Sequence, residues 1–291
     1  ECVTLTSVSP PGNASVGSVW SSARKVSFSR RAPRAWKVVG YRNVQELHAK
    51  IASISSRVSK AECLDLPDKV FLDRWVKLEG EQARVYRDLR RDAVARLKTA
   101  KGEGQLTLRN ILSEALRLLQ VAGGHFPMDD GTVQALEPSA KLTALRELIE
   151  DLGHKQAVIW CAFKAEVSQI ATMLGKDAVE FTGDTSAKER TEALEIFRTG
   201  DVRYFVGTAS AGGTGVNGLQ VSDVEIYFSR NYNLAEFLQS QDRCHRVGMG
   251  KNNLSIIKLL AENTVDCKID QSLDKKRDLQ DLMLSDPEDM L

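Results

Sequence analysis

The sequence predicts an α/β protein built around a parallel β-sheet. From residue 139 onward, short apolar stretches of strand length alternate with longer segments whose apolar residues recur every three to four positions. Repeated β–α units of this length imply a parallel sheet with helices on both faces. The longest apolar run, Ala157–Phe163, has seven residues. A membrane-spanning helix needs about 20, so we exclude an integral membrane protein.

The individual elements follow from local patterns. We expect helices over 141–152, 164–174 and 234–247, and strands over 157–161, 179–181, 202–206, 224–228 and 254–259. Ser186 is followed three residues later by Glu189, a capping box that opens another helix, and Gly200 suits its end. Val265, Ile269 and Leu273 lie one turn apart and predict a final helix.

Composition shifts along the chain predict four segments. Residues 1–40 contain eight serines and no apolar periodicity, which indicates a linker or a disordered lead-in. The segments are this linker (1–40), a mainly helical extension (41–138), the α/β lobe (139–280) and an acidic tail (281–291). Within the extension we expect helices over 43–58 and 80–122, a strand over 70–76 and a loop over 127–138.

Charge and cysteine content narrow the function classes. The net charge is +1, but residues 1–45 hold seven bases and one acid (+6), and residues 262–291 hold four bases and nine acids (−5). A surface that binds polyanions must therefore be local. The five cysteines are odd in number and form no CxxC, which argues against disulfides or a zinc site. We expect a reducing compartment and no metal ligands in this chain.

The segment 239–248 carries the strongest candidate for chemistry. Gln239, Arg243 and Arg246 have the spacing i, i+4, i+7, which places them on one face of a helix that continues through all three. Two guanidinium groups and an amide suit an array of anionic oxygens, because each guanidinium is a planar fork of donors. The competing interpretation is a solvated face on which Asp242 pairs with Arg246.

The second candidate is the glycine-rich run 208–217, directly after an expected strand. In a parallel sheet, ligands gather beyond the carboxyl ends of the strands, and glycines let backbone N–H groups approach phosphate oxygens. A plain strand-to-helix turn explains the same run. A dinucleotide fingerprint fits less well, because the spacing is not GxGxxG and no acidic residue stands where the ribose contact is needed.

Two motifs are absent from the sequence. There is no GxxxxGK[ST], the Walker A phosphate cradle; the nearest run, 248–252, has the wrong spacing and carries Asn252 where Ser or Thr is needed. There is also no Asp–Glu pair at the end of an apolar strand that could bind Mg²⁺. We therefore expect that the chain cannot build a complete nucleoside-triphosphatase site by itself.

Taken in order, these residues resemble the C-terminal RecA-like lobe of superfamily 2 helicases, most closely the Swi/Snf-type double-stranded DNA translocases. The resemblance covers about 41–275. It rests on segments 57–69 (link between lobes), 139–142 (start of the lobe), 159–163 (motif IV), 181–197, 211–217 (motif V) and 231–246 (motif VI). Met249 in place of Gln and Tyr232 in place of Trp mark a divergent branch, such as a bacterial or phage one.

The resemblance implies an ATPase site shared between two lobes, with Walker A and Mg²⁺ ligation supplied by an N-terminal lobe outside this sequence. It assigns ATP contacts to Gln239, Arg243, Arg246 and Gly215, with Arg246 and Arg243 as catalytic arginine fingers. It assigns contacts with the DNA backbone to Ser210, Gly212, Gly213 and Thr214.

The function implied by the resemblance is one half of an ATP-dependent DNA helicase or translocase that is inactive alone. Its cofactors would be ATP and Mg²⁺, and its partners double-stranded DNA and the N-terminal lobe. The setting would be the cytoplasm of a bacterial or phage-infected cell, or the nucleus of a eukaryote. Two alternatives stay open: a non-catalytic nucleic-acid-binding module, and a dinucleotide-binding half of an oxidoreductase.

Overall fold

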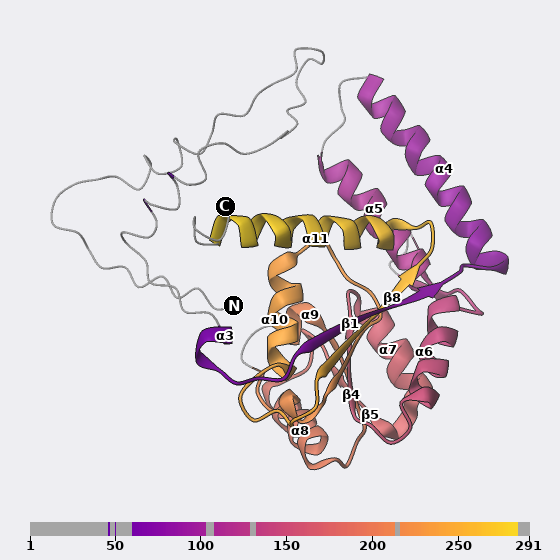
Figure 1. The fold of residues 1–291 in the computed structure, drawn as a ribbon. Helices are drawn as coiled ribbons and strands as arrows, with labels where there is room; N and C mark the ends of the chain where they lie inside the picture. Colours follow the sequence, from indigo (N-terminus) through magenta and orange to yellow (C-terminus); the bar gives the residue numbers. More distant parts are fainter. Residues whose placement is uncertain are drawn as a thin grey trace. The chain divides into compact units, whose positions relative to one another are not determined.

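The computed structural model describes residues 46, 50, 60–102, 108–128, 132–212 and 216–284 (Figure 1). The chain divides into two compact units, Leu64–Asp274 and a second that combines Glu1–Cys63 with Lys275–Leu291. The described part of the second unit contains α3 (Lys60–Cys63) and the end of α11 (Val265–Leu284). The predicted linker 1–40, most of the predicted helix 43–58 and residues 285–291 of the acidic tail lie outside the described residues.

A six-stranded parallel sheet forms the centre of the unit Leu64–Asp274. Its strand order is β1-β8-β7-β4-β6-β5, and every pairing within it is parallel. The strands are β1 (Lys69–Val76), β4 (Ala157–Cys161), β5 (Ala178–Phe181), β6 (Tyr204–Thr208), β7 (Val224–Tyr227) and β8 (Leu254–Ala261). The parallel sheet predicted from the β–α alternation is confirmed.

Helices cover both faces of this sheet (Figure 1). One face packs against α6 (Ala140–Asp151) and α7 (Lys164–Leu174), and the other against α8 (Ala187–Thr199), α10 (Leu234–Cys244) and the start of α11. Along β4, Ile159 packs into the first layer and its neighbours Val158 and Trp160 into the second, because successive side chains of a strand point to opposite faces. Both layers are apolar, which is why β4 is an unbroken apolar run.

Local signals in the sequence set the bounds of several elements. At the start of α8 the Ser186 side chain accepts from the Glu189 N–H at 3.3 Å, and the Glu189 carboxylate accepts from the Ser186 N–H at 2.9 Å. Gly200 ends the helix with φ 86°, a conformation that favours glycine. The capping box is therefore confirmed. The β6 strand begins two residues later than predicted, because the Val202 N–H is bonded to the Ile196 carbonyl at the end of α8.

The segment before the lobe contributes both a strand and helices. The predicted strand 70–76 is confirmed as β1, which pairs with β8 at the edge of the sheet. The helices are α4 (Gly80–Gly102) and α5 (Leu108–Ala122). The predicted loop 127–138 is wrong in part, because β2 (His125–Pro127) pairs with β3 (Val133–Ala135). Three residues per strand are too few to show the two-residue alternation from which a strand is recognised.

The segment boundaries at residues 40, 138 and 280 stay predictions. No helix among the described residues combines the length and the apolar character that crossing a membrane requires.

Candidate functional site

The helix α10 carries two of the three side chains predicted to meet an anion. The Asn233 side chain caps its first turn, accepting from the N–H groups of Ala235 at 3.1 Å and Glu236 at 3.4 Å. One face of the helix is buried, while Gln239 is exposed and Arg243 is half-buried on the side away from the core. The i, i+4 pair Gln239 and Arg243 therefore shares one face, as the spacing predicts.

Arg246 does not lie on this helix, so the prediction of a helix through residue 247 is wrong. The helix ends at Cys244, and His245 leaves the helical conformation with φ −78° and ψ 75°. The His245 ring Nε2–H donates to the Pro67 carbonyl at 2.8 Å. This contact with the segment before β1 directs the chain away from the helix axis, and a turn with Gly248 at φ 95° follows.

The same geometry removes the basis of the competing interpretation. An i, i+4 pair between Asp242 and Arg246 requires a continuous helix, and the helix stops before Arg246. The Asp242 carboxylate instead lies 3.6 Å from Lys69 Nζ at the start of β1.

The glycine-rich run follows β6 at the carboxyl edge of the sheet. After Thr208, the last residue of β6, the run continues as α9 (Ala209–Gly212), in which Ser210 is exposed and Gly212 is buried. A Cβ atom at Gly212 would lie 2.4 Å from the ring of Trp160, which is itself fully buried, so only glycine fits. Three predicted site residues, Gly213, Thr214 and Gly215, lie outside the described residues.

The structure brings the two candidate segments into direct contact. Arg243 Nη1 donates to the Val216 carbonyl at 3.2 Å, and Arg246 Nη1 donates to Asn217 Oδ1. Both arginines thus hold the end of the glycine-rich run. Burial and, second, the positive charge of Arg246 lower the pKa of the Arg243 guanidinium. Asn217 was not among the predicted site residues, because 29 positions separate it from Arg246 and no local pattern joins them.

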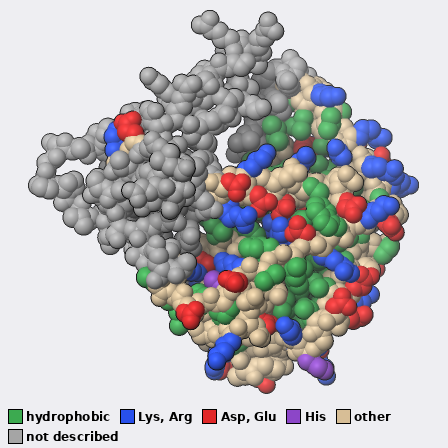
Figure 2. Space-filling view, in the orientation of Figure 1, with side chains coloured by type: hydrophobic (Ala, Val, Ile, Leu, Met, Phe, Trp, Pro, Cys, Tyr) green, Lys and Arg blue, Asp and Glu red, His purple; other side chains and the backbone are tan. Residues whose placement is uncertain are grey.

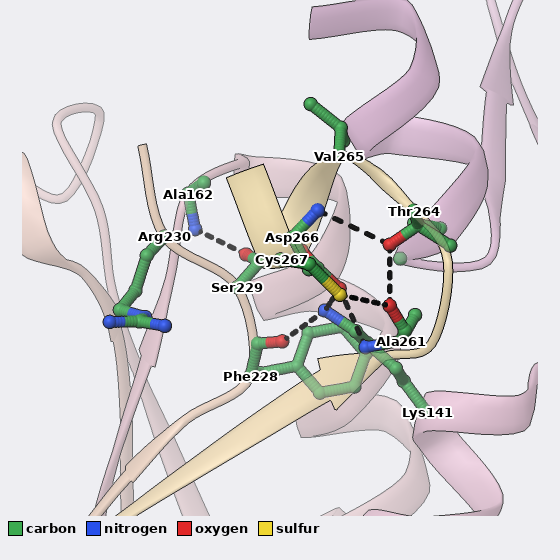
Figure 3. A network of polar contacts seen from close by, with 12 residues as sticks. Lys141, Ala162, Phe228, Ser229, Arg230, Ala261, Thr264, Val265, Asp266 and Cys267 are labelled. Atoms are coloured by element: carbon green, nitrogen blue, oxygen red, sulfur yellow. Dashed lines mark hydrogen bonds and ion pairs between the residues drawn. The ribbon is translucent and has the colours of Figure 1, made fainter. Parts of the chain in front are cut away.

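A network of buried polar side chains lies at this edge of the sheet (Figure 3). Lys141 is fully buried, and its Nζ lies 2.6 Å from Asp266 Oδ2 and donates to the Phe228 carbonyl at 2.9 Å. The adjacent Ser229 accepts from the Ala162 N–H at 2.7 Å and donates to the Glu166 carboxylate. The network ties together the ends of β4 and β7 and the start of α11.

A second set of ion pairs anchors the segment that leads into α10. Arg230 Nη2 lies 2.6 Å from Asp270 Oδ1 on α11, and Lys258 Nζ lies 3.0 Å from the same atom and 2.8 Å from Asp73 Oδ1. The Arg230 guanidinium also stacks on Phe237, 5.0 Å from the ring centroid. Sequence reasoning missed these residues because their partners lie on different elements.

One carboxyl group is buried directly beneath α10. Glu225 on β7 is fully buried, and burial raises its pKa to about 7, against hydrogen bonds from Cys244 and Tyr227 that lower it. The Tyr227 hydroxyl also contacts Ser240 of α10 at 2.6 Å. The inner side of the arginine-bearing helix therefore rests on a group that titrates near neutral pH.

We expect Glu225→Gln to stabilise the protein above pH 7 by up to about 3 kcal/mol. Between about pH 4.5 and about pH 7 the folded protein retains the Glu225 proton while the unfolded chain has lost it, so the free energy of unfolding falls as pH rises. The amide removes the contribution of Glu225 to this slope, and the contribution of the buried Glu166, whose pKa burial also raises to about 7, remains. Urea unfolding of both proteins across this range measures the difference.

The matched control is Glu192→Gln, which neutralises an exposed carboxylate on α8. An identical pH dependence in the wild type, Glu225→Gln and Glu192→Gln would contradict the expectation.

The charges at this edge suit a phosphate group. Two guanidinium groups lie close enough for one to depress the pKa of the other, and an anion between them would relieve that repulsion. Among the described residues, no three His, Cys, Asp or Glu side chains are grouped to hold a metal ion. The described residues of this edge therefore suit an anionic group.

Comparison with protein-family models and curated proteins shows which known proteins this chain is similar to. Residues 140–248 match the helicase conserved C-terminal domain. An uncharacterized ATP-dependent helicase of Mycoplasma genitalium is 27% identical over 242 residues, which cover 81% of this chain and 23% of that protein. The chromatin structure-remodeling complex subunit snf21 of Schizosaccharomyces pombe is 25% identical over 234 residues, 72% of this chain and 19% of that protein. The chain spans about a fifth of the length of these relatives.

Solved structures show the same architecture. The SWI2/SNF2 ATPase core of Sulfolobus solfataricus, solved in complex with dsDNA, has a TM-score of 0.58 and 28% identity, and the match covers 81% of this chain and 50% of that one. The C-terminal domain of the SWI2/SNF2 ATPase from the same organism matches in fold, with a TM-score of 0.55, 24% identity and coverage of 76% and 92%.

The fold and the family match together define a helicase C-terminal domain, a RecA-like lobe built on one parallel sheet. Within that class, the chain is similar to the C-terminal lobe of Snf2-type ATP-dependent helicases. The resemblance drawn from the sequence motifs is confirmed.

Proposed function

We propose that this chain is the C-terminal half of an ATP-dependent translocase or helicase that acts on double-stranded DNA. Its ATPase site would be completed by an N-terminal lobe that carries Walker A and binds Mg²⁺. Residues 139–280 would form the lobe proper and residues 41–138 the link between lobes. The proposed setting is the cytoplasm of a bacterial or phage-infected cell, or the nucleus if the source is eukaryotic.

The observation that carries the proposal is the contact of Arg243 and Arg246 with Val216 and Asn217. Arg246 is exposed and can turn from Asn217 to an anion that approaches this edge. In the proposal Arg246 and Arg243 donate hydrogen bonds to the γ-phosphate as negative charge develops there. Gln239, on the same face as Arg243, orients the arginines or the nucleotide, and Gly215 adds a backbone contact.

The same contact would couple phosphate binding at the arginines to DNA binding by the glycine-rich run. Ser210, Gly212, Gly213 and Thr214 precede the residues that the arginines hold, and in the proposal they contact the DNA backbone without reading bases. When Arg246 exchanges Asn217 for phosphate oxygens, the end of this run loses one of its anchors. Phosphate binding would thereby change the grip of the loop on DNA, and ATP hydrolysis would supply the free energy for that cycle.

We expect this chain alone to release no phosphate from ATP above background, with or without duplex DNA, because the sequence contains no Walker A cradle. Phosphate release at saturating DNA is the measurement. A protein that joins this chain to a Walker A lobe is the positive control and should show DNA-stimulated turnover. Robust turnover by this chain alone would contradict the shared-site proposal, and no turnover in the joined protein would favour a non-catalytic binding module.

A further inference from the structure

The outer face of α4 carries a row of basic side chains that the proposed ATPase site does not use. Residues 80–102 include seven bases and three acids. A shallow hollow on this helix is lined by Arg87, Arg90, Arg91, Val94, Ala95 and Lys98, all of them exposed. In Figure 2 blue side chains follow the edge of the molecule where Figure 1 draws α4.

The opposite face of α4 is firmly packed, so this row has a defined position. Tyr86 is buried, and its hydroxyl accepts from the Val265 N–H at 2.8 Å. The buried Gln82 donates to the Val121 carbonyl at 2.8 Å. Further along, the Arg96 guanidinium binds both oxygens of Glu114 on α5 at 2.8 Å each. Because the inner face of α4 is packed in this way, the fold holds the basic row in a fixed position on the surface.

Of the four bases in the row, three are not neutralised within the helix, and Arg91 is the exception. Arg91 lies 3.3 Å from Asp88 and 3.1 Å from Asp92. Among the described residues, no carboxylate lies within 4.0 Å of Arg87, Arg90 or Lys98. Like charges three and four residues apart destabilise a helix by a few tenths of a kcal/mol, and solvated helix faces normally alternate in sign. Helix stability therefore does not account for the row.

The location of α4 suits an extended polyanion. The helix begins four residues after the carboxyl end of β1, and because the sheet is parallel this is the edge at which β6 leads into the glycine-rich run. In the strand order, β1 and β6 are four spacings apart, about 19 Å. That separation is comparable with the width of a DNA duplex. From Arg87 to Lys98 the row extends about 16 Å, over which duplex DNA carries about nine phosphate charges.

We propose that the outer face of α4 is a second contact with the backbone of duplex DNA, beyond the glycine-rich run after β6. This inference rests on the proposed function. Each guanidinium can donate two hydrogen bonds to a phosphate, and contacts of this type raise affinity without reading sequence. The alternative partner, an acidic amphipathic peptide, needs an apolar stripe along the groove. Val94 is the single large apolar side chain in the hollow.

The test is duplex binding by the full chain carrying Arg87→Gln, Arg90→Gln and Lys98→Gln, measured by fluorescence anisotropy over a series of salt concentrations. Loss of three phosphate contacts should lower the slope of log K against log salt by about 2.7 and weaken binding at low salt by about tenfold. A variant with Arg87→Lys and Arg90→Lys keeps the charges and should retain most of the slope.

The matched control is Lys155→Gln, Lys176→Gln and Lys251→Gln. These exposed lysines lie just before β4, β5 and β8, at the amino edge of the sheet. Replacing them removes the same total charge as the α4 variant. Equal slopes for the wild type and the α4 variant, or equal losses in the α4 variant and this control, would overturn the inference and leave the proposed function standing. A wild-type chain that binds no duplex at all would overturn both. All variants alter exposed side chains, so their melting temperatures should match that of the wild type.

Discussion

Arg246→Ala, in a protein that joins this chain to a Walker A lobe, is expected to lower kcat for ATP by about 10³-fold or more. In the proposed function, Arg246 meets negative charge that develops in the transition state, so kcat should fall more than ATP binding weakens. The fold should be unaffected, because Arg246 is exposed and its bond to Asn217 contributes about 1 kcal/mol. Phosphate release and the melting temperature, measured on the same variant, check both parts.

Two further variants sharpen this test. Arg246→Lys should rescue turnover poorly, because an ammonium group does not reproduce the guanidinium fork. Arg146→Ala removes an exposed arginine from α6, on the other face of the sheet from α10, and should leave turnover unchanged. Near wild-type kcat in Arg246→Ala would remove the arginine-finger assignment.

The largest expected effect on stability comes from Lys141→Met, which should lower the free energy of unfolding by about 3–5 kcal/mol. Lys141 and Asp266 form a buried pair at 2.6 Å. Methionine fills a similar volume but leaves the Asp266 carboxylate buried without its cation, and that desolvated charge dominates the cost. Urea unfolding monitored by circular dichroism measures the change.

The double variant Lys141→Met with Asp266→Asn should recover much of the loss, because it no longer buries an uncompensated charge. The matched control is Lys155→Met. Lys155 pairs with Asp223 at 3.4 Å but is about half exposed, so it should cost less than about 1 kcal/mol. Equal costs for Lys141→Met and Lys155→Met would show that the buried pair does not carry this stability.

Several elements could be predicted because their causes are local. The helix α8 begins at a capping box and ends at a glycine, and both signals lie within the helix itself. The strand β4 is buried on both faces, and its five apolar residues show this directly. The shared face of Gln239 and Arg243 follows from helix geometry alone.

The parts that could not be predicted depend on distant residues. The end of α10 is decided by His245, which donates to a carbonyl 178 positions away. The β1 strand was predicted from its own sequence, but its place beside β8 depends on a partner strand 185 residues later. The buried pair of Lys141 and Asp266 has no local signature either.

The sequence by itself therefore determined the α/β class, most strands and helices, the likeness to a helicase C-terminal lobe, and which residue types could meet phosphate. Those properties depend on periodicity, caps and motif order within short stretches of chain. The tertiary structure alone decided that Arg246 leaves the helix, that both arginines hold the end of the glycine-rich run, and that Glu225 is buried beneath α10. These arrangements arise when strands far apart in sequence pair, since burial and hydrogen bonding in the assembled sheet outweigh the local preference for continuing a helix.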